Sequence, residues 1–344
     1  MNTPRHWILA APFIAGPGDT WLDRFVPGSR HCFATVPATY AHDRSRRQTS
    51  VGQWRDYFVH ANAAWRARRQ AGHAVGIITV FPQLALAVGL RQRLSRQHTP
   101  VLAWTFNVGH LPGGMKGRLA RAAMREVDRF VVHSRVEVAA YSDWLDVPPE
   151  RFSYVPLQRP LRPIEFVEDE REPFLLAMGS ARRDYRLFFD VVEALGYRTI
   201  VVAGAQALVG LRIPSNVSVR SGLDIAECHA LAQRARINVV PIDNSDTASG
   251  QVTLIDSMMF ARPTVATRSI GTEDYDNDGR TALLVPADDR QAMRDAIACL
   301  WDDPKRRAGI GAAARRFVAE TLSDEATGIK LGSILDELAD SHAK

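Results

Sequence analysis

Short apolar runs alternate along the chain with longer segments whose apolar residues recur at helical spacing. In the first half, the strand-like runs cover residues 6–10, 75–81, 100–106 and 129–132. The segments 84–93 and 116–127 between them repeat apolar residues every few positions, which is typical of amphipathic helices. Alternation of buried strands with helices predicts an α/β fold with a doubly wound parallel sheet.

This pattern is interrupted and then starts again. Residues 155–163 contain three prolines, and an acidic stretch follows at 165–172. Further strand-like runs then lie at 174–179, 199–204, 237–241, 263–267 and 282–286, followed by helical sequence. We therefore predict two doubly wound, Rossmann-like domains, at 1–160 and 161–320, facing each other across a cleft. A C-terminal helix at 321–344 is expected to pack back towards the first domain.

Composition suits two globular domains, since the chain has 344 residues, of which 46% are hydrophobic and 24% charged. The three cysteines, Cys32, Cys228 and Cys299, lie far apart and form no CxxC motif, so we expect reduced thiols. We find no leader sequence and no apolar stretch of about 18 residues, which favours a cytoplasmic protein.

Positive charge is concentrated in the first half of the chain. Residues 1–160 contain 21 Lys/Arg and 10 Asp/Glu, whereas residues 161–344 contain 22 and 28. Basic side chains recur at helical spacing in two segments, with Arg66 and Arg69 in one and Lys116, Arg118, Arg121 and Arg125 in the other. They form either a solvated helix face or a surface for an anionic membrane or a phosphate-bearing acceptor. No nucleic-acid-binding motif accompanies them, so we expect no nucleic-acid partner.

Several common catalytic motifs are absent from the sequence. Gly16 and Gly18 follow the first strand, but Trp21 stands where a dinucleotide fingerprint needs its third glycine. The sequence also lacks a Walker-type loop, a GxSxG elbow and a metal-spaced cluster of histidines and cysteines. We therefore expect no NAD and no metal, and we assign Gly16 and Gly18 to a loop that contacts a donor ligand in the cleft.

The strongest local signal for a ligand site lies at residues 248–263, after a buried strand and an acidic loop that contains Asp246. A small turn opens a helix there, and the free N–H groups of such a turn suit a diphosphate. The candidate donor-binding residues in this turn are Ser249, Gly250, Gln251, Val252 and Thr253. Asp256, further along the helix, is expected to accept hydrogen bonds from a ribose. A helix N-terminus capped by Ser249, with Asp256 in solvent, is the alternative.

A second element that is suited to binding phosphate follows the strand at 174–179. Gly179 and Ser180 form a turn, and Arg182 and Arg183 come directly after it. Guanidinium groups bind phosphate oxygens in a bidentate way. Because both elements follow parallel strands of the same domain, we expect them at the same edge of the sheet.

The C-terminal half resembles the donor domain of retaining GT-B glycosyltransferases of group 1 (family 4 type). The resemblance covers residues 130–318 and is carried by three segments: 130–158, which resembles the end of the first domain; 175–195, the phosphate-binding loop; and 249–289, the donor-site helix with its next strand. It implies a GT-B fold and transfer of a sugar from a nucleotide-diphosphate donor of the UDP or GDP type, with retention and without a metal.

The resemblance also implies roles for individual residues. Arg183, with Arg182, would neutralise the diphosphate, and Asp256 stands near the family glutamate that binds the ribose. The family has a pair of glutamates about seven residues apart that this chain lacks, since Thr247 and Ala248 fall at the first position. The family histidine after the strand at 101–105 is replaced by Phe106, and His110 is the candidate substitute. Arg183 and His110 are thus the predicted catalytic residues.

Together these observations predict a cytoplasmic glycosyltransferase, held at the inner membrane surface, with a lipid-linked or polysaccharide acceptor on its basic first domain. Two other classes stay open. A non-catalytic GT-B scaffold or partner subunit would bind the nucleotide without turnover, and a nucleotide-sugar epimerase of GT-B fold would release an isomerised product without any acceptor.

Overall fold

The computed structural model describes residues 4–16, 21–26, 30–40, 49–72, 74–95, 98–243, 247–276 and 279–342. The chain divides into two compact units. Unit 1 consists of Met1–Pro156 together with Asp324–Lys344, and unit 2 of Leu157–Ser323.

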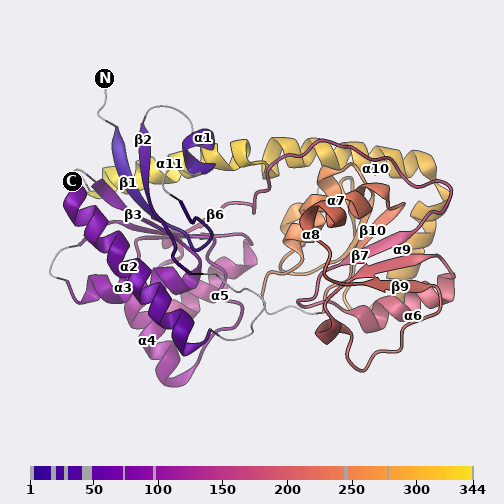
Figure 1. Cartoon of the computed structure of the whole chain (residues 1–344), viewed down its shortest axis with the longest axis horizontal. Helices are drawn as coiled ribbons and strands as arrows, with labels where there is room; N and C mark the ends of the chain where they lie inside the picture. Colours follow the sequence, from indigo (N-terminus) through magenta and orange to yellow (C-terminus); the bar gives the residue numbers. More distant parts are fainter. Residues whose placement is uncertain are drawn as a thin grey trace. The chain divides into compact units, whose positions relative to one another are not determined.

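Unit 1 is built on a six-stranded sheet whose strands all run parallel, in the order β2-β1-β3-β4-β5-β6 (Figure 1). The strands are β1 (Arg5–Ala10), β2 (His31–Val36), β3 (Ala74–Val80), β4 (Val101–Trp104), β5 (Arg129–Val132) and β6 (Phe152–Tyr154). The helices are α1 (Trp21–Phe25), α2 (Val51–Ala71), α3 (Pro82–Arg93), α4 (Gly114–Met124), α5 (Val136–Leu145), the 3-10 turn η1 (Pro149–Arg151) and α11 (Asp324–His342).

Helices cover both faces of this sheet. On one face, α2, α3, α4 and α5 bury a core that includes Tyr57, Leu84 and Tyr141. On the other face, Leu22 of α1 and Leu335 of α11 pack on the strands. The longest of these helices, α2, begins with a capping box, in which Gln53 N donates to Ser50 Oγ at 3.3 Å and Ser50 N donates to Gln53 Oε1 at 3.0 Å.

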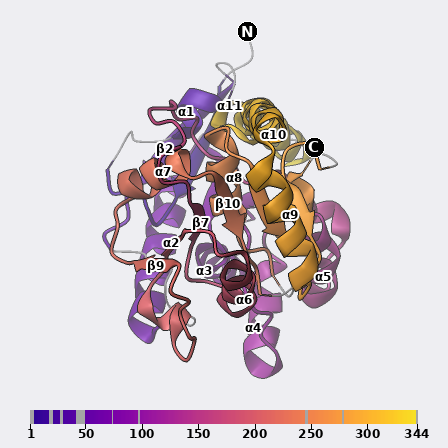
Figure 2. The same cartoon turned by 90° about the vertical axis from the view of Figure 1, so that its right-hand side faces the viewer.

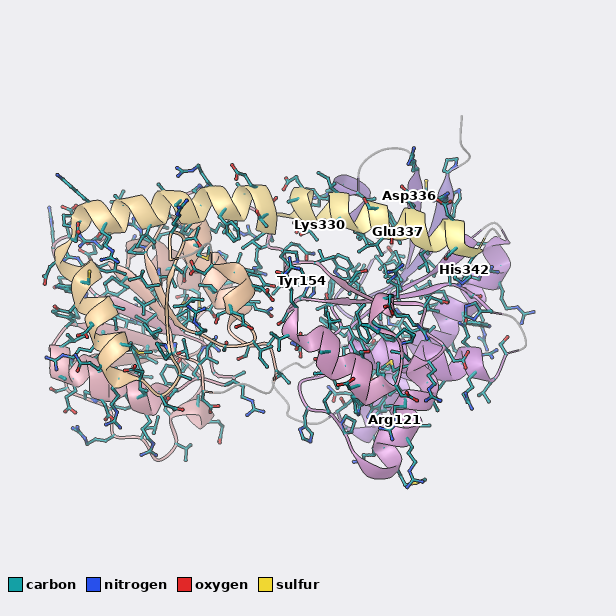
Figure 3. All side chains as sticks on the ribbon, turned by 180° about the vertical axis from the view of Figure 1, so that it is seen from behind. Arg121, Tyr154, Lys330, Asp336, Glu337 and His342 are labelled. Carbon is teal, nitrogen blue, oxygen red and sulfur yellow. The ribbon has the colours of Figure 1, made fainter. Side chains whose placement is uncertain are left out.

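Helix α11 joins unit 1 although it follows unit 2 in the sequence. Its Asp336 accepts a hydrogen bond from Arg5 at 2.7 Å, and Glu337 lies 3.4 Å from Arg129. Figure 3 shows Asp336, Glu337 and His342 along this helix beside the strands of unit 1. Gly328 allows α11 to approach α1 closely, because a Cβ there would lie 2.0 Å from the carbonyl oxygen of Phe25.

Unit 2 repeats the architecture with a second parallel six-stranded sheet, in the order β12-β11-β10-β7-β8-β9. Its strands are β7 (Leu175–Met178), β8 (Thr199–Val202), β9 (Val217–Arg220), β10 (Ile237–Val240), β11 (Thr264–Thr267) and β12 (Leu283–Val285). Its helices are α6 (Tyr185–Leu195), α7 (Ile225–Arg234), α8 (Gln251–Met259), α9 (Arg290–Asp302) and α10 (Pro304–Phe317), with the short turns η2 (Ala205–Leu208) and η3 (Glu273–Tyr275) and the π-helical turn η4 (Val318–Leu322).

Two separate cores again lie on the two faces of the sheet. Phe188 of α6 and Ile297 of α9 belong to one core, and Figure 2 shows these two helices side by side. Leu254 of α8 and Ala314 of α10 belong to the other. The α/β fold with two doubly wound parallel sheets is therefore confirmed.

Three strands were not predicted from the sequence: β2, β6 and β9. All three are edge strands of their sheets. The helix expected at 116–127 is α4, which begins and ends a few residues earlier, at Gly114 and Met124. No helix in the part of the chain that the structure describes is long and apolar enough to cross a membrane.

Candidate active site

The N-terminus of α8 is formed by a tight turn at Gly250. The φ angle of Gly250 is 82°, and a Cβ there would lie 2.5 Å from Cδ1 of Ile242, so the position suits only glycine. The first N–H that bonds back within the helix is that of Leu254, which donates to Gly250 O at 2.9 Å. Because the N–H groups ahead of it have no carbonyl in a preceding turn, the helix presents donors and a positive dipole end.

Ser249 does not cap this helix, contrary to the alternative considered above. The N-cap residue is Gly250, and the helix start has no side-chain cap hydrogen bond within the described residues. Ser249 Oγ is buried and has no hydrogen-bond partner among the residues that the structure describes. A buried hydroxyl without a partner is costly, so a bound ligand beside the turn would satisfy it.

Arg183 connects the turn after β7 to the first turn of α8. Its guanidinium donates from Nε to Met178 O at 3.1 Å, from Nη1 to Ala181 O at 2.8 Å and from Nη2 to Thr253 Oγ1 at 3.1 Å. The contact is possible because β7 and β10 are neighbours, so the segments that follow them meet at the carboxyl edge of the sheet. The expectation that the glycine-arginine loop and the start of α8 lie at the same edge of the sheet is thereby confirmed.

The electrostatic state of Arg183 favours an anionic ligand. Burial lowers the pKa of this guanidinium from its ordinary value, and the neighbouring phenol of Tyr185 acts in the opposite direction. An arginine stays protonated at neutral pH even so. A partly desolvated cation has lost solvation energy that an anion can restore. The guanidinium has five N–H donors and makes three hydrogen bonds within the described residues, so two donors are left for a ligand.

Gly179 and Ser180 shape the loop that holds Arg183. The φ angle of Gly179 is 112°, and a Cβ there would lie 2.6 Å from Arg183 Nη2. Tyr185 fixes the same turn by donating its hydroxyl proton to Gly179 O at 2.5 Å. Ser180 Oγ accepts a hydrogen bond from Gly204 N at 2.8 Å, which ties the loop to the segment after β8. Arg182 is exposed, and its φ of 53° places it in the left-handed region.

Asp256 lies in an internal ion pair. Its carboxylate accepts hydrogen bonds from Arg159 Nε at 2.9 Å and Arg159 Nη2 at 3.2 Å, and His229 Nε2 lies 3.5 Å away. Burial by itself would raise the pKa of Asp256, but the hydrogen bonds and charges of His229 and Arg159 outweigh it and lower the pKa. The alternative of a solvated Asp256 is wrong, since the residue is 7% exposed. Its contact with a ribose stays a prediction, and a ribose would share the carboxylate with Arg159.

Four residues around α8 were missed by the sequence analysis: Arg159, His229, Gly271 and Tyr275. Gly271 lets the segment after β11 approach the turn, because a Cβ there would lie 2.2 Å from Ser249 O. The hydroxyl of Tyr275 accepts hydrogen bonds from Gln251 Nε2 at 3.1 Å and Leu157 N at 2.7 Å. No local pattern marks these residues, since each acts on a partner far away in the sequence.

The predicted site residues of unit 1 lie on its own loops. Gly16 follows β1 and His110 follows β4, so both lie at the carboxyl edge of that sheet, and His110 is exposed. Phe106, at the family histidine position, is a core residue that packs edge-on against Phe130 and Tyr141, with ring centroids 4.9 and 5.3 Å apart. Gly18 and Asp246 lie outside the described residues. The roles of Gly16 and His110 stay predictions.

The basic residues of α2 and α4 fall into two groups. Arg66, Arg69, Lys116 and Arg118 are exposed. Arg121, labelled in Figure 3, is half-buried and lies 3.5 Å from Trp144 O, and Arg125 pairs with Asp146. Arg121 and Arg125 thus have partners on α5 and at its end, and the assignment of these basic residues to an acceptor or membrane surface stays a prediction.

One group of side chains outside this site could hold a metal ion. Among the described residues it is the only such group, and it consists of His98, Asp128 and His342 in unit 1. His98 Nδ1 lies 3.1 Å from Gln92 Nε2, and Gln92 Oε1 accepts from Thr99 N at 3.1 Å. This arrangement makes Nδ1 of His98 an acceptor, so Nε2 carries the proton and donates to Asp128 at 2.9 Å. A protonated Nε2 is a poor metal ligand.

Two consecutive doubly wound units, with a glycine loop and a helix start that meet at the carboxyl edge of the second sheet, are the arrangement of a GT-B fold. Solved structures share this fold over nearly the whole chain. A glycosyltransferase from Rickettsia africae superposes with a TM-score of 0.69 at 11% identity, covering 98% of this chain and 99% of that one. HepE from Anabaena, solved in complex with UDP, gives 0.66 at 14% identity, covering 97% and 100%.

Sequence comparison relates the second unit to a known family. Residues 173–303 match the model of the family described as "Glycosyl transferases group 1", so this part of unit 2 is similar to that family. A D-rhamnosyltransferase, WbpZ of Pseudomonas aeruginosa, is 25% identical over 150 residues, which is 40% of this chain and 38% of that protein. The chain thus matches well under half the length of this relative. The resemblance to group 1 glycosyltransferases and the GT-B fold inferred from the sequence are confirmed, whereas retention stays a prediction.

Proposed function

We propose that the chain is a glycosyltransferase that takes a sugar from a nucleotide-diphosphate donor, of the UDP or GDP type, and transfers it with retention to a lipid-linked or polysaccharide acceptor. The observation that carries the proposal is the convergence of Arg183 with the first turn of α8, through the hydrogen bond to Thr253. The family match of unit 2 and the UDP complex of HepE support a nucleotide-sugar donor.

In the proposed reaction, the bond between the anomeric carbon and the diphosphate oxygen breaks while a bond to the acceptor oxygen forms on the same face. The acceptor proton passes to the departing diphosphate. Negative charge on the diphosphate therefore grows in the transition state, close to Arg183 and the N–H groups of Val252 and Thr253. Donors that are held in place before the reaction stabilise such charge without reorganisation. This step needs neither a protein base nor a metal.

The first experiment is a calorimetric titration of the chain with UDP, GDP, ADP and CDP, without metal and then with magnesium. We expect one nucleotide to bind and Arg183→Ala to abolish binding. Transfer should fall about 100-fold or more, the usual loss when a preorganised donor to developing charge is removed. Arg186→Ala is the matched control, because Arg186 is exposed on the same helix start. Wild-type turnover in Arg183→Ala would contradict the proposal, and the anomeric configuration of the product, read by NMR, tests retention.

A second candidate is a non-catalytic scaffold of GT-B fold. It is favoured by the ion pair of Asp256 with Arg159 and by Ala248, which is buried where the family has a glutamate. Nucleotide binding without hydrolysis or transfer of any donor sugar would support this function instead. An isomerised donor released without acceptor would support the epimerase.

A further inference from the structure

Unit 1 has an unusually one-sided charge in the layer formed by α2, α3 and α4. Residues 51–125 contain eleven Lys/Arg and a single acidic residue, Asp56. The three helices cover the same face of the sheet, with α3 packed between α2 and α4 (Figure 1). Since α3 is largely buried there, the outer surface of this layer belongs mainly to α2 and α4.

The outward stripe of α4 combines bases with large apolar side chains. Met115 is 75% exposed and Leu119 is 52% exposed. Lys116 and Arg118 are exposed beside them, and neither pairs with an acid within the residues that the structure describes. Met115, Arg118 and Leu119 are spaced by three and four positions, so they share one side of the helix.

Helix α2 repeats this combination. Val51, Phe58 and Val59 are exposed in its first half, and Arg55 is exposed among them. Arg66 and Arg69 continue the same stripe in its second half, and both are exposed. Single exposed apolar residues are ordinary, but their repetition on two helices of one layer with almost no acid is not. We call the exposed residues of α2 and α4 together the α2–α4 face.

We infer that the α2–α4 face docks on the surface of an anionic lipid bilayer, with Met115 and Leu119 entering the headgroup boundary. The charge of the layer is complementary to an anionic leaflet, and each Lys/Arg close to such a surface contributes about 1 kcal/mol. The exposed side chains of Met115 and Leu119 favour a lipid bilayer over a nucleic acid as the anionic partner. They gain free energy by leaving water for acyl chains, whereas the phosphate backbone of a nucleic acid offers them nothing comparable.

Docking of this kind also predicts which acceptor the enzyme prefers. This prediction of the acceptor rests on the proposed function. A chain held at a bilayer by unit 1 meets acceptors that are themselves embedded in the bilayer. Of the two acceptor classes above, the lipid-linked class is therefore the one that the α2–α4 face selects.

The test is co-sedimentation of the whole chain with vesicles of phosphatidylglycerol and phosphatidylcholine, and with vesicles of phosphatidylcholine alone. We expect binding to the anionic vesicles only, weakening as salt is raised. Removing the charges of Lys116→Ala/Arg118→Ala, or the apolar side chains of Met115→Ser/Leu119→Ser, should each weaken partitioning about tenfold or more.

Matched controls lie in unit 2. Arg294→Ala/Lys305→Ala removes the same charge from exposed positions, and Val209→Ser/Ile225→Ser removes exposed apolar side chains. Both control pairs should bind vesicles like the unmodified chain. Equal loss in the controls, no binding to anionic vesicles at low salt, or indifference to Met115→Ser/Leu119→Ser would overturn the inference. Binding of a random oligonucleotide in place of vesicles would assign the face to nucleic acid and overturn it as well.

Nucleotide titration of the same variants separates this inference from the proposed function. Each variant should keep the unfolding temperature and the nucleotide affinity of the unmodified chain, because the substituted residues are exposed on unit 1 and the proposed nucleotide site is built from residues of unit 2. A chain that binds nucleotide but no vesicles refutes the docking inference alone. A chain that binds vesicles but no nucleotide refutes the proposed function alone.

Discussion

The two units have the same architecture, yet the glycine in the loop after the first strand has different surroundings in each unit. In unit 2, Gly179 follows β7 with a φ of 112°, and Arg183 packs where a side chain would stand. In unit 1, Gly16 lies six residues after the end of β1, and a Cβ there would meet no described residue within 4 Å. A glycine in the loop after the first strand is thus a steric requirement in unit 2 and replaceable in unit 1. Architecture repeats, and the specialisation lies in the loops and surfaces.

The units also differ in net charge. Unit 1 contains 22 Lys/Arg and 15 Asp/Glu, whereas unit 2 contains 21 and 23. Unit 2 nevertheless holds the guanidinium of Arg183 partly buried in its loop. A bound anion would restore the solvation energy that the guanidinium loses through this burial. Exposed positive charge on α2 and α4 attracts extended anionic surfaces, whereas a single partly buried cation binds one anionic group.

The largest effect on stability is expected from Asp256→Asn, which breaks the internal ion pair of unit 2. Loss of the charge leaves Arg159 without its carboxylate and should cost about 2 kcal/mol of the free energy of unfolding. Urea unfolding measures it. Asp190→Asn is the control, because the pair of Asp190 with Arg290 is exposed and should contribute under about 1 kcal/mol.

The pH dependence of unfolding identifies the same pair. The folded pKa of Asp256 lies below its ordinary value of 3.8, so its stabilisation is present above that pH and is lost as the pH falls through the folded pKa. Asp256→Asn should remove this part of the acid sensitivity. Unchanged stability together with weaker nucleotide binding would instead show that Asp256 serves only the ribose.

A smaller effect is expected from Gly179→Ala, which tests whether the glycine loop of unit 2 positions Arg183. The new Cβ should displace the guanidinium and weaken nucleotide binding about tenfold, with a strain of about 1 to 2 kcal/mol in stability. Gly196→Ala is a control with a similar backbone, since its φ is 70° and nothing lies within 4 Å of a Cβ. It should lose stability but keep the nucleotide affinity, and equal loss of affinity in both variants would refute the positioning role.

The smallest effect is expected from Gly16→Ala, a change in the loop after the first strand of unit 1. Because a Cβ there meets no described neighbour within 4 Å, the free energy of unfolding should change by less than about 0.5 kcal/mol. Thermal unfolding of the variant beside Gly179→Ala measures the difference between the two glycines directly. A destabilisation as large as that of Gly179→Ala would remove the contrast between the units.

Most of the fold could be predicted from hydrophobic runs, and the failures have one physical cause. Central strands such as β4 and β7 are buried on both faces, so they are continuous apolar stretches. The strands that were missed lie at sheet edges, where β9, with the sequence Val-Ser-Val-Arg, exposes most of its side chains. Half-exposed strands need fewer apolar residues and leave a weaker pattern.

The candidate site was predicted where one segment carries the chemistry and missed where distant segments meet. Gly250 and Arg183 are visible because a glycine turn beside a helix start, or beside arginines, is a local pattern. The pairing of Arg159 with Asp256 spans 97 positions. Nothing close to either residue in the sequence specifies the other, so only the folded chain shows that the carboxylate has a partner.

The placement of α11 in unit 1 has a consequence for biosynthesis. A chain growing from its N-terminus exposes all of unit 2 before residues 324–342 leave the ribosome. Until then the face of the first sheet that Leu331, Leu335 and Leu338 later cover lacks these side chains. The second unit can therefore complete its folding first, and the first-made unit is the last to be finished. A released chain truncated after Ser323 should accordingly expose this face and bind chaperones through unit 1.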